Sequence, residues 1–219
     1  MDQLDLPVVG GRQSLREQVA QALRASLIAG EMRPGVVYSA PVLAAQFGVS
    51  PTPVREAMLD LAKEGLVEAV RNKGFRVMEL SDRELDEITE LRGLIEVPVV
   101  ARLAETADPE SLERLRPVAE EIVAAAEARD LLTYVNADIR FHLALLGLAG
   151  NSHLVDVVRD LRNRARLYGL SALAERGALV DSAREHLHLL DLMLQRDATA
   201  AATLTTGHIQ KTRGIWSRP

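Results

Sequence analysis

The sequence predicts a mainly α protein, in which a small domain of three helices and a β-hairpin precedes an all-α helical bundle. Three observations predict this architecture. Hydrophobic residues make up 47% of the 219 residues and aromatic residues only 3%, a balance that favours helices over a sheet sandwich. Apolar residues recur at helical spacing along most of the chain. Strand-like segments are confined to residues 66–80.

Composition and charge restrict the possible functions. The chain has no cysteine, which excludes disulfides, a cysteine-type zinc finger and a thiol nucleophile. No apolar run approaches the roughly 18 residues of a membrane span, and the N-terminus carries acids where a signal peptide is basic, so we expect a cytoplasmic protein without a membrane partner. Residues 1–80 hold 9 basic and 9 acidic side chains, whereas residues 81–219 hold 17 and 22 and therefore carry the whole net charge of −5. A nucleic-acid surface is expected in the first part.

The first two helices are marked by their ends. Ser14 and Glu17 form a capping box, and Gly30 suits the left-handed residue that follows a helix. Pro41 suits the first position of a short second helix, which Gly48 ends. The first helix shows apolar residues at every fourth position, namely Leu15, Val19, Leu23 and Leu27.

The third helix begins in the string SPTPVRE. We expect Ser50 to be its N-cap, with the hydroxyl accepting a backbone hydrogen bond. Pro51 and Pro53 then fall in the first turn, where backbone N–H groups have no helical partner to lose, so the prolines begin the helix. Thr52 and Arg55 are expected at its exposed N-terminal end.

A β-hairpin follows this helix. The segments LVEAV and FRVMEL are typical of two strands, joined by the turn RNKG at 71–74. Two short helices joined by GVS form a helix-turn-helix, and with the hairpin they form a winged helix-turn-helix, whose hairpin tip can reach DNA phosphates or the minor groove. For the helix pair alone, the alternative is an αα-hairpin with no ligand.

The run LAAQFGVSPTPVREAMLDLAKEGLVEAVRNKGFRV, residues 43–77, resembles the DNA-binding domain of the GntR family of bacterial transcription regulators. The resemblance implies a sequence-specific regulator that binds a palindromic double-stranded operator as a homodimer, with one half-site for each winged helix. In this family the start of the third helix reads the major groove and the wing supports it. Carried over to this sequence, the implied DNA contacts are Ser50, Thr52, Arg55, Arg71, Asn72, Lys73 and Gly74.

One departure from the family pattern concerns base recognition. The family commonly has arginine where this chain has Pro51, so a guanidinium able to bind guanine is absent. Arg55 is then the principal base-reading candidate of the helix. The alternative role for Arg55 is an ion pair within its own helix, for example with Asp60.

The remaining sequence predicts six or seven packed helices. Ser81 and Glu84 form a second capping box before a long helix, which we expect Pro98 to bend. Asp108 with Pro109 caps the next helix.

Further breaks between helices are expected at residues 129–130, 147–152, 177 and 197. The chain thus divides into an N-terminal tail at 1–12, a winged helix-turn-helix at 13–80 and an all-α domain at 81–219.

Four titratable residues are predicted to face the interior of the bundle from three helices. Asp138 and His142 share one helical face, His186 lies on an apolar stripe, and His208 follows Leu204 by one turn. The stripe of His186 comprises Leu179, Ala183, Leu190 and Met193, whereas His188 lies on the solvent face with Asp181, Glu185, Asp191 and Gln195.

A single inward histidine is more often a core residue than a ligand. Burying three with an aspartate is costly unless they share a partner, and a cation supplies one. Three imidazoles and a carboxylate suit Zn²⁺, with Ni²⁺, Mn²⁺ or Fe²⁺ as alternatives, and leave coordination positions open.

The segments DIRFHLALLGLAGNSHL, EHLHLLDLMLQRDATAA and HI (208–209) resemble the C-terminal ligand domain of FadR-like GntR regulators, often called FCD. Metal-binding members carry D-x3-H and two further histidines, the last pair 22 residues apart, as His186 and His208 are. The resemblance implies that a small organic acid binds at the open metal positions and alters operator affinity, most often in a repressor. It also implies effector contact by an arginine on the first helix of the domain, which Arg92 matches, with Arg164 as a second candidate. The alternative for Arg92 is a surface ion pair with Glu96.

Two other interpretations stay open. Three imidazoles with an open metal position also describe hydrolytic and oxidative enzymes, although no general base is evident beside the four ligands and the winged helix would be unexplained. In the second interpretation, the chain is a DNA-binding regulator whose metal ion is purely structural or is itself the signal. We expect a regulator rather than an enzyme.

Overall fold

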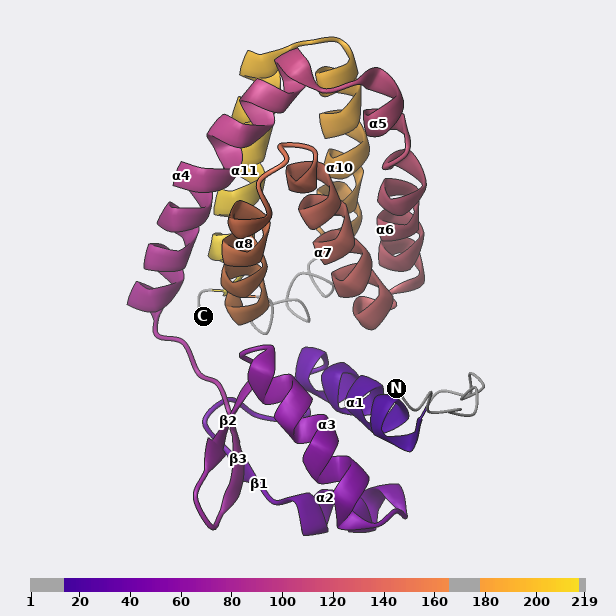
Figure 1. Cartoon of the computed structure of the whole chain (residues 1–219), viewed down its shortest axis with the longest axis vertical. Helices are drawn as coiled ribbons and strands as arrows, with labels where there is room; N and C mark the ends of the chain where they lie inside the picture. The colour runs from indigo at the N-terminus through magenta and orange to yellow at the C-terminus, as the bar shows by residue number, and fades with distance from the viewer. Residues whose placement is uncertain (1–13, 166–177, 217–219) are drawn as a thin grey trace, which may run out of the picture.

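The computed structural model describes residues 14–165 and 178–216, which form two lobes (Figure 1). The N-terminal lobe combines three helices with a small sheet, and the C-terminal lobe consists of helices within the described ranges, so the predicted fold class is confirmed. The predicted tail at 1–12 and the predicted break at residue 177 lie outside these ranges. Among the described helices, none has both the length and the apolar character that crossing a lipid bilayer requires.

The N-terminal lobe contains α1 (Leu15–Ile28), β1 (Val37–Tyr38), α2 (Ala40–Phe47), α3 (Pro51–Lys63), β2 (Val67–Val70) and β3 (Gly74–Val77). The capping box of Ser14 is formed at α1, and Gly48 ends α2 in the left-handed conformation with a φ of 66°. Pro41 is the second residue of α2 rather than the first. Leu15 is 48% exposed because it lies in the first turn of α1, ahead of the buried stripe that starts at Val19.

The start of α3 differs from the prediction in one detail. Ser50 is the N-cap, but its hydroxyl makes no capping hydrogen bond. Such a hydroxyl accepts from the N–H of the second or third helical residue, and the third is Pro53, which has none. The helix is held instead by its inner face, where Val54, Ala57, Met58 and Leu61 are fully buried.

The sheet has three antiparallel strands in the order β1-β3-β2. The hairpin of β2 and β3 is the predicted wing, with Val70 opposite Gly74. Strand β1 pairs on the other side of β3, with Tyr38 opposite Phe75, and is absent from the sequence-based prediction. Two residues are too few to show an alternating pattern, so this strand exists only through its pairing with β3.

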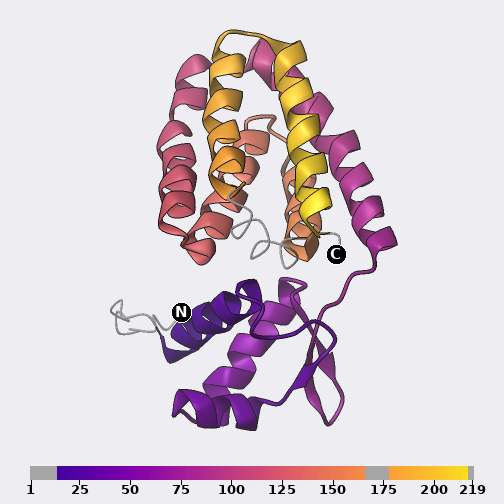
Figure 2. The same ribbon diagram turned by 180° about the vertical axis from the view of Figure 1, so that it is seen from behind.

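The C-terminal lobe contains seven helices in the described ranges: α4 (Asp82–Thr106), α5 (Pro109–Glu113), α6 (Arg116–Ala128), α7 (Leu131–Gly147), α8 (Ser152–Ala165), α10 (Leu179–Leu194) and α11 (Ala198–Trp216). The predicted capping box of Ser81 and Glu84 is formed at the start of α4, and the Asp108 carboxylate caps α5 as predicted by accepting from the backbone N–H of Ser111. Pro98 lies inside α4, which continues beyond it to Thr106. Helix α11 runs along α4, as Figure 2 shows from behind.

The two lobes are joined by packed side chains. Leu80 of the connecting segment is buried together with Leu85 at the start of α4 and Ala165 at the end of α8. Ile28, the last residue of α1, belongs to the core of the C-terminal bundle. The connecting segment thus packs against the start of α4 and the end of α8, while α1 contacts α7 of the bundle.

Candidate DNA-binding surface and metal centre

A groove of about 540 Å³ separates α3 from the wing. Arg55 and Leu59 of α3 line one side, and the hairpin residues 69–75 line the other. Residues 39–41, where α2 begins, close its end. The groove therefore contains five of the predicted DNA contacts, namely Arg55, Arg71, Asn72, Lys73 and Gly74.

The cations of this groove are available to a ligand. Arg55, Arg71 and Lys73 are exposed and have no ion-pair partner among the residues that the structure describes. Asp60, the alternative partner of Arg55, is bound by Arg16 of α1 instead. The ion pair considered for Arg55 is therefore not formed in this structure.

The remaining predicted contacts lie at the edge of the groove or shape it. Ser50 and Thr52 are exposed at the start of α3, outside the groove lining. At the wing tip Asn72 adopts a left-handed φ of 59°. Gly74 has a φ of 133°, and a Cβ there would lie 2.3 Å from the carbonyl oxygen of Tyr38. Only glycine permits this approach, so Gly74 sets the shape of the wing.

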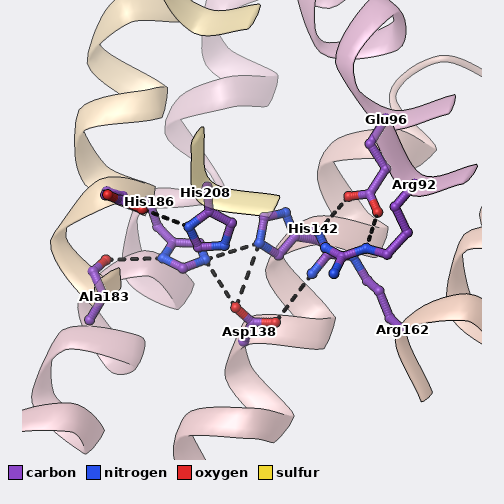
Figure 3. A network of polar contacts seen from close by, with 9 residues as sticks. Arg92, Glu96, Asp138, His142, Arg162, Ala183, His186 and His208 are labelled. Carbon is purple, nitrogen blue, oxygen red and sulfur yellow. Dashed lines mark hydrogen bonds and ion pairs between the residues drawn. The ribbon is translucent and has the colours of Figure 1, made fainter. Parts of the chain in front are cut away.

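In the C-terminal lobe four predicted ligands converge (Figure 3). Asp138 and His142 come from α7, His186 from α10 and His208 from α11. One potential ligand atom from each lies within 4.8 Å of the others. The buried ring of Phe141 packs edge-on against His142 and His186 and limits their motion. His188 is exposed, as its position on the helix predicted.

Two of the three imidazoles have a defined tautomer. His186 Nδ1 lies 3.0 Å from the carbonyl oxygen of Ala183, and His208 Nδ1 lies 2.8 Å from Glu185 Oε2. A carbonyl and a carboxylate only accept, so Nδ1 of each ring donates its hydrogen. In the neutral rings Nε2 then carries a lone pair.

The lone pair on His186 Nε2 faces other acceptors. Asp138 Oδ1 is 3.1 Å away and His142 Nε2 is 3.0 Å away, while His142 Nε2 and Asp138 Oδ1 are 3.6 Å apart. Acceptor atoms at this spacing need a cation or a proton between them. The donor set of three imidazoles and one carboxylate thus fits a divalent metal such as Zn²⁺.

The protonation states agree with metal ligation. Burial lowers the pKa of His142 well below its ordinary value and also lowers the pKa of His208. Burial alone would raise the pKa of Asp138, but the adjacent histidines and Arg162 outweigh it and hold that pKa well below its ordinary value. Neutral imidazoles and an ionised carboxylate are the forms that bind metal.

A chain of ion pairs extends from Asp138, whose side chain is 19% exposed, to the buried Arg162, Glu96 and Arg92. Arg162 of α8 donates from Nη1 to Asp138 Oδ2 at 3.3 Å and from Nη2 to Glu96 Oε2. Arg92 Nε donates to Glu96 Oε1 at 2.7 Å. Burial alone would raise the pKa of Glu96, but the two guanidiniums lower it to about 2. Arg92 Nη2 and Arg162 Nε are buried and have no hydrogen-bond partner in the described part of the chain.

This chain revises two predictions about arginines. Arg92 does pair with Glu96, but the pair is buried, with side chains 3% and 2% exposed, and not on the surface. Arg164 is exposed and lies beside Gly65 of the N-terminal lobe, so it does not join the cluster. The arginine of α8 that joins the cluster is Arg162, which was not predicted from the sequence. Its spacing from buried Val158 was the signal that could have identified it.

Glu185 was also placed wrongly. Its side chain is 14% exposed and contacts His208, although the helical pattern put it on the solvent face with His188. A small cavity of about 10 Å³ adjoins the three histidines, with room for about one water molecule. It is lined by His142, Glu185, His186, Leu189, Leu204, Thr205 and His208.

Comparisons with known proteins agree with this architecture. Residues 15–77 match the model of "Bacterial regulatory proteins, gntR family", and residues 87–211 match the FCD domain. The Nta operon transcriptional regulator of Aminobacter aminovorans is 33% identical over 181 residues, which cover 82% of this chain and 83% of that protein. The HTH-type transcriptional repressor RspR of Escherichia coli K12 is 25% identical over 202 residues, 91% of this chain and 87% of the relative.

A solved structure of E. coli McbR/YncC has a TM-score of 0.71 and 29% identity, and the match covers 94% of this chain and 98% of that one. These relatives are named as transcriptional regulators, not enzymes. The chain belongs to the GntR family of bacterial transcriptional regulators, with an FCD domain following its DNA-binding domain.

Proposed function

We propose that this regulator binds its operator as a homodimer through the winged helix-turn-helix, and that a divalent metal together with a small organic acid controls this binding. Repression with release by the acid is the direction we favour, because relatives such as RspR are named repressors. The convergence of the partly exposed Asp138 with three buried histidines in one cluster is the observation that carries the control by metal and acid.

The DNA contact is proposed for the groove between α3 and the wing. Arg55 enters the major groove, where a guanidinium can bind guanine through two hydrogen bonds. Ser50 and Thr52 contact the backbone or bases beside it, since both are exposed at the same helix start. The wing residues Arg71, Asn72, Lys73 and Gly74 lie at the far side of the groove, where the two cations neutralise phosphates.

The metal would be held by Asp138, His142, His186 and His208. Zn²⁺ fits this donor set best, and Ni²⁺, Mn²⁺ and Fe²⁺ are alternatives. When bound, the ion supplies positive charge and open coordination positions. His186 and His208 keep Nε2 directed inward because Ala183 and Glu185 hold their other nitrogens.

An anionic effector follows from the charge of the site. The chain of Arg92, Glu96, Arg162 and the partly exposed Asp138 has two positive and two negative groups, so it is neutral by itself. A divalent ion would leave two uncompensated positive charges in a region of low dielectric. A carboxylate from a small organic acid offsets them. The unpartnered Arg92 Nη2 and Arg162 Nε are further donors for it if the site opens.

The size of the cavity determines how an acid can enter. About 10 Å³ accommodates a water but no organic acid, so binding requires α10 and α11 to move at Leu189, Leu204 and Thr205. The same observation favours a second candidate function, in which the metal is structural or is itself the signal and no acid binds.

Isothermal titration distinguishes these functions. Metal-free protein is titrated with Zn²⁺, and the loaded protein is then titrated with sugar acids, hydroxy acids and dicarboxylates, with and without EDTA. We expect Zn²⁺ to bind and one class of acid to bind only the loaded protein. Binding of Zn²⁺ without any acid response supports the second candidate, and absence of binding when Zn²⁺, Ni²⁺, Mn²⁺ and Fe²⁺ are each titrated overturns both.

The ligand assignment has a matched control within one helix. His186→Ala should lose most of the bound metal, whereas His188→Ala, two residues away on the exposed face, should retain it. Elemental analysis of both purified variants provides the measurement. Equal loss in the two variants contradicts the assignment.

A further inference from the structure

Glu185 has a side chain whose position is unexpected for its place on α10. It precedes His186 directly, yet its carboxylate turns to α11 and is 14% exposed. Oε2 accepts from His208 Nδ1 at 2.8 Å, and Oε1 pairs with Lys211 Nζ. One carboxylate therefore binds two residues of the neighbouring helix at successive turns.

The contact with His208 differs from the corresponding contact of His186. His186 Nδ1 donates to Ala183, a backbone carbonyl of its own helix, so α10 itself orients that ring. His208 depends on a charged side chain from another helix. His208 is also the sole member of the proposed ligand set that α11 contributes. If Glu185 were neutral and small, nothing described in the structure would fix which nitrogen of His208 faces the other ligands.

We propose that Glu185 is a positioning residue for the metal centre, and this rests on the proposed function. It holds His208 with Nδ1 protonated and Nε2 directed at His142 and His186, whose ring centroids lie 5.4 Å and 4.9 Å away. The negative charge makes the imidazole a stronger donor to a cation. Lys211, with a side chain 64% exposed, holds the second carboxylate oxygen and keeps Glu185 in this rotamer.

The proposal predicts graded effects of substitution on metal affinity. Glu185→Leu removes the acceptor and should weaken Zn²⁺ binding by about 10- to 100-fold, the usual consequence of losing such a partner. Glu185→Gln keeps an oxygen that can accept from His208 Nδ1 but loses the charge, so its loss should be smaller and still measurable. Lys211→Met should have the smallest effect of the three.

The test uses the full chain in competition with a chelator of known Zn²⁺ affinity. Glu127→Leu is the matched control, because Glu127 forms a surface pair with Arg184 and does not touch a histidine. The visible spectrum of Co²⁺-loaded protein gives a second measurement, which should change in Glu185→Leu, remain close to wild type in Glu185→Gln, and be unchanged in the control.

The outcomes separate this inference from the proposed function. Wild type that binds no Zn²⁺ overturns both. Wild type that binds while both Glu185 variants match its affinity and its Co²⁺ spectrum overturns the positioning role alone. A variant with a lower melting temperature but unaltered affinity and spectrum also overturns it, because a purely structural role would produce that pattern.

Discussion

In the N-terminal lobe the cations that line the groove are exposed and unpaired within the described residues, whereas in the C-terminal lobe the charged side chains nearest the histidines are buried and paired. Arg55 and Lys73 keep their charge free for an external polyanion. The positive charges of Arg162 and Arg92 are balanced by the carboxylates of Glu96 and Asp138.

The difference has physical consequences. Exposed cations interact with a distant anion at little desolvation cost, and salt weakens the interaction. For buried cations the desolvation free energy is already included in the free energy of folding. In the folded protein they then respond to any change in the balance of charge around them. The first arrangement suits reversible contact with DNA, and the second suits a centre that detects an added charge.

The largest expected effect is on the free energy of unfolding, when the series of ion pairs between Asp138 and Arg92 is broken. Arg162→Met leaves the carboxylates of Glu96 and Asp138 without their shared partner, and should lower the free energy of unfolding by about 3–5 kcal/mol. Chemical denaturation of metal-free protein provides the measurement.

The control for this change is on the same helix. Arg159→Met removes an exposed pair with Asp156 and should cost no more than about 1 kcal/mol. Similar losses in the two variants would show that burial does not distinguish these pairs.

The next effect is expected from removal of the proposed metal ion. Because the ligands are assembled only in the folded state, metal at a hundred times its Kd should add about 2.7 kcal/mol to the free energy of unfolding. EDTA should therefore lower the melting temperature of wild type, and Asp138→Asn should reduce that response, since it removes the one carboxylate of the ligand set. A wild-type melting curve that EDTA leaves unaltered argues against a bound ion.

The third effect is on operator binding. Arg55→Ala should cost about 1–3 kcal/mol of specific affinity, as for loss of a base contact through two hydrogen bonds. Lys73→Ala should weaken specific and non-specific binding alike and lower the salt slope by about one unit. Both are measured by fluorescence anisotropy at several salt concentrations.

Lys63 at the far end of α3 supplies the reference. Its side chain is 76% exposed and lies in the last turn, so Lys63→Ala should bind operator like wild type. If Arg55→Ala does so as well, the recognition end of α3 has been assigned wrongly.

The candidate site was predictable where the information lies along one helix. The 3.6-residue period separates inward His186 from exposed His188, and Ser81 with Glu84 marks the start of α4. The same period identifies the face of α8 that carries Arg162, although Arg164 was the residue of this helix predicted as an effector contact.

Contacts between helices were not predictable in this way. Glu185 lies at the border of the two faces of α10, and only the position of α11 decides that it meets His208. Strand β1 is defined by its register with β3 and not by a pattern of its own. Which charged groups become partners across the bundle depends on packing, which a single sequence does not record.

The smallest expected effect on stability concerns the place where the two lobes meet. Arg213 of α11 binds Asp86 Oδ1 at 2.6 Å and the carbonyl oxygen of Asp82 at 3.1 Å, at the first turns of α4. The same helix carries His208, so this contact connects the candidate metal centre to the helix that follows the DNA-binding domain. Asp86 is 65% exposed, and losing the pair should therefore cost no more than about 1 kcal/mol.

The effect of Arg213→Gln on coupling should be larger than its effect on stability. Metal-free protein should bind operator as wild type does, whereas the difference in operator affinity between the metal-loaded and metal-free forms should shrink, because the start of α4 loses its hydrogen bonds from Arg213 of α11. Arg116→Gln removes a comparable pair between α6 and α10, away from the junction, and should leave that difference intact. If both variants retain the full difference in operator affinity between metal-loaded and metal-free protein, the signal passes between the lobes by another route. Ile28 and Leu80, which pack where the lobes meet, are then the next residues to substitute.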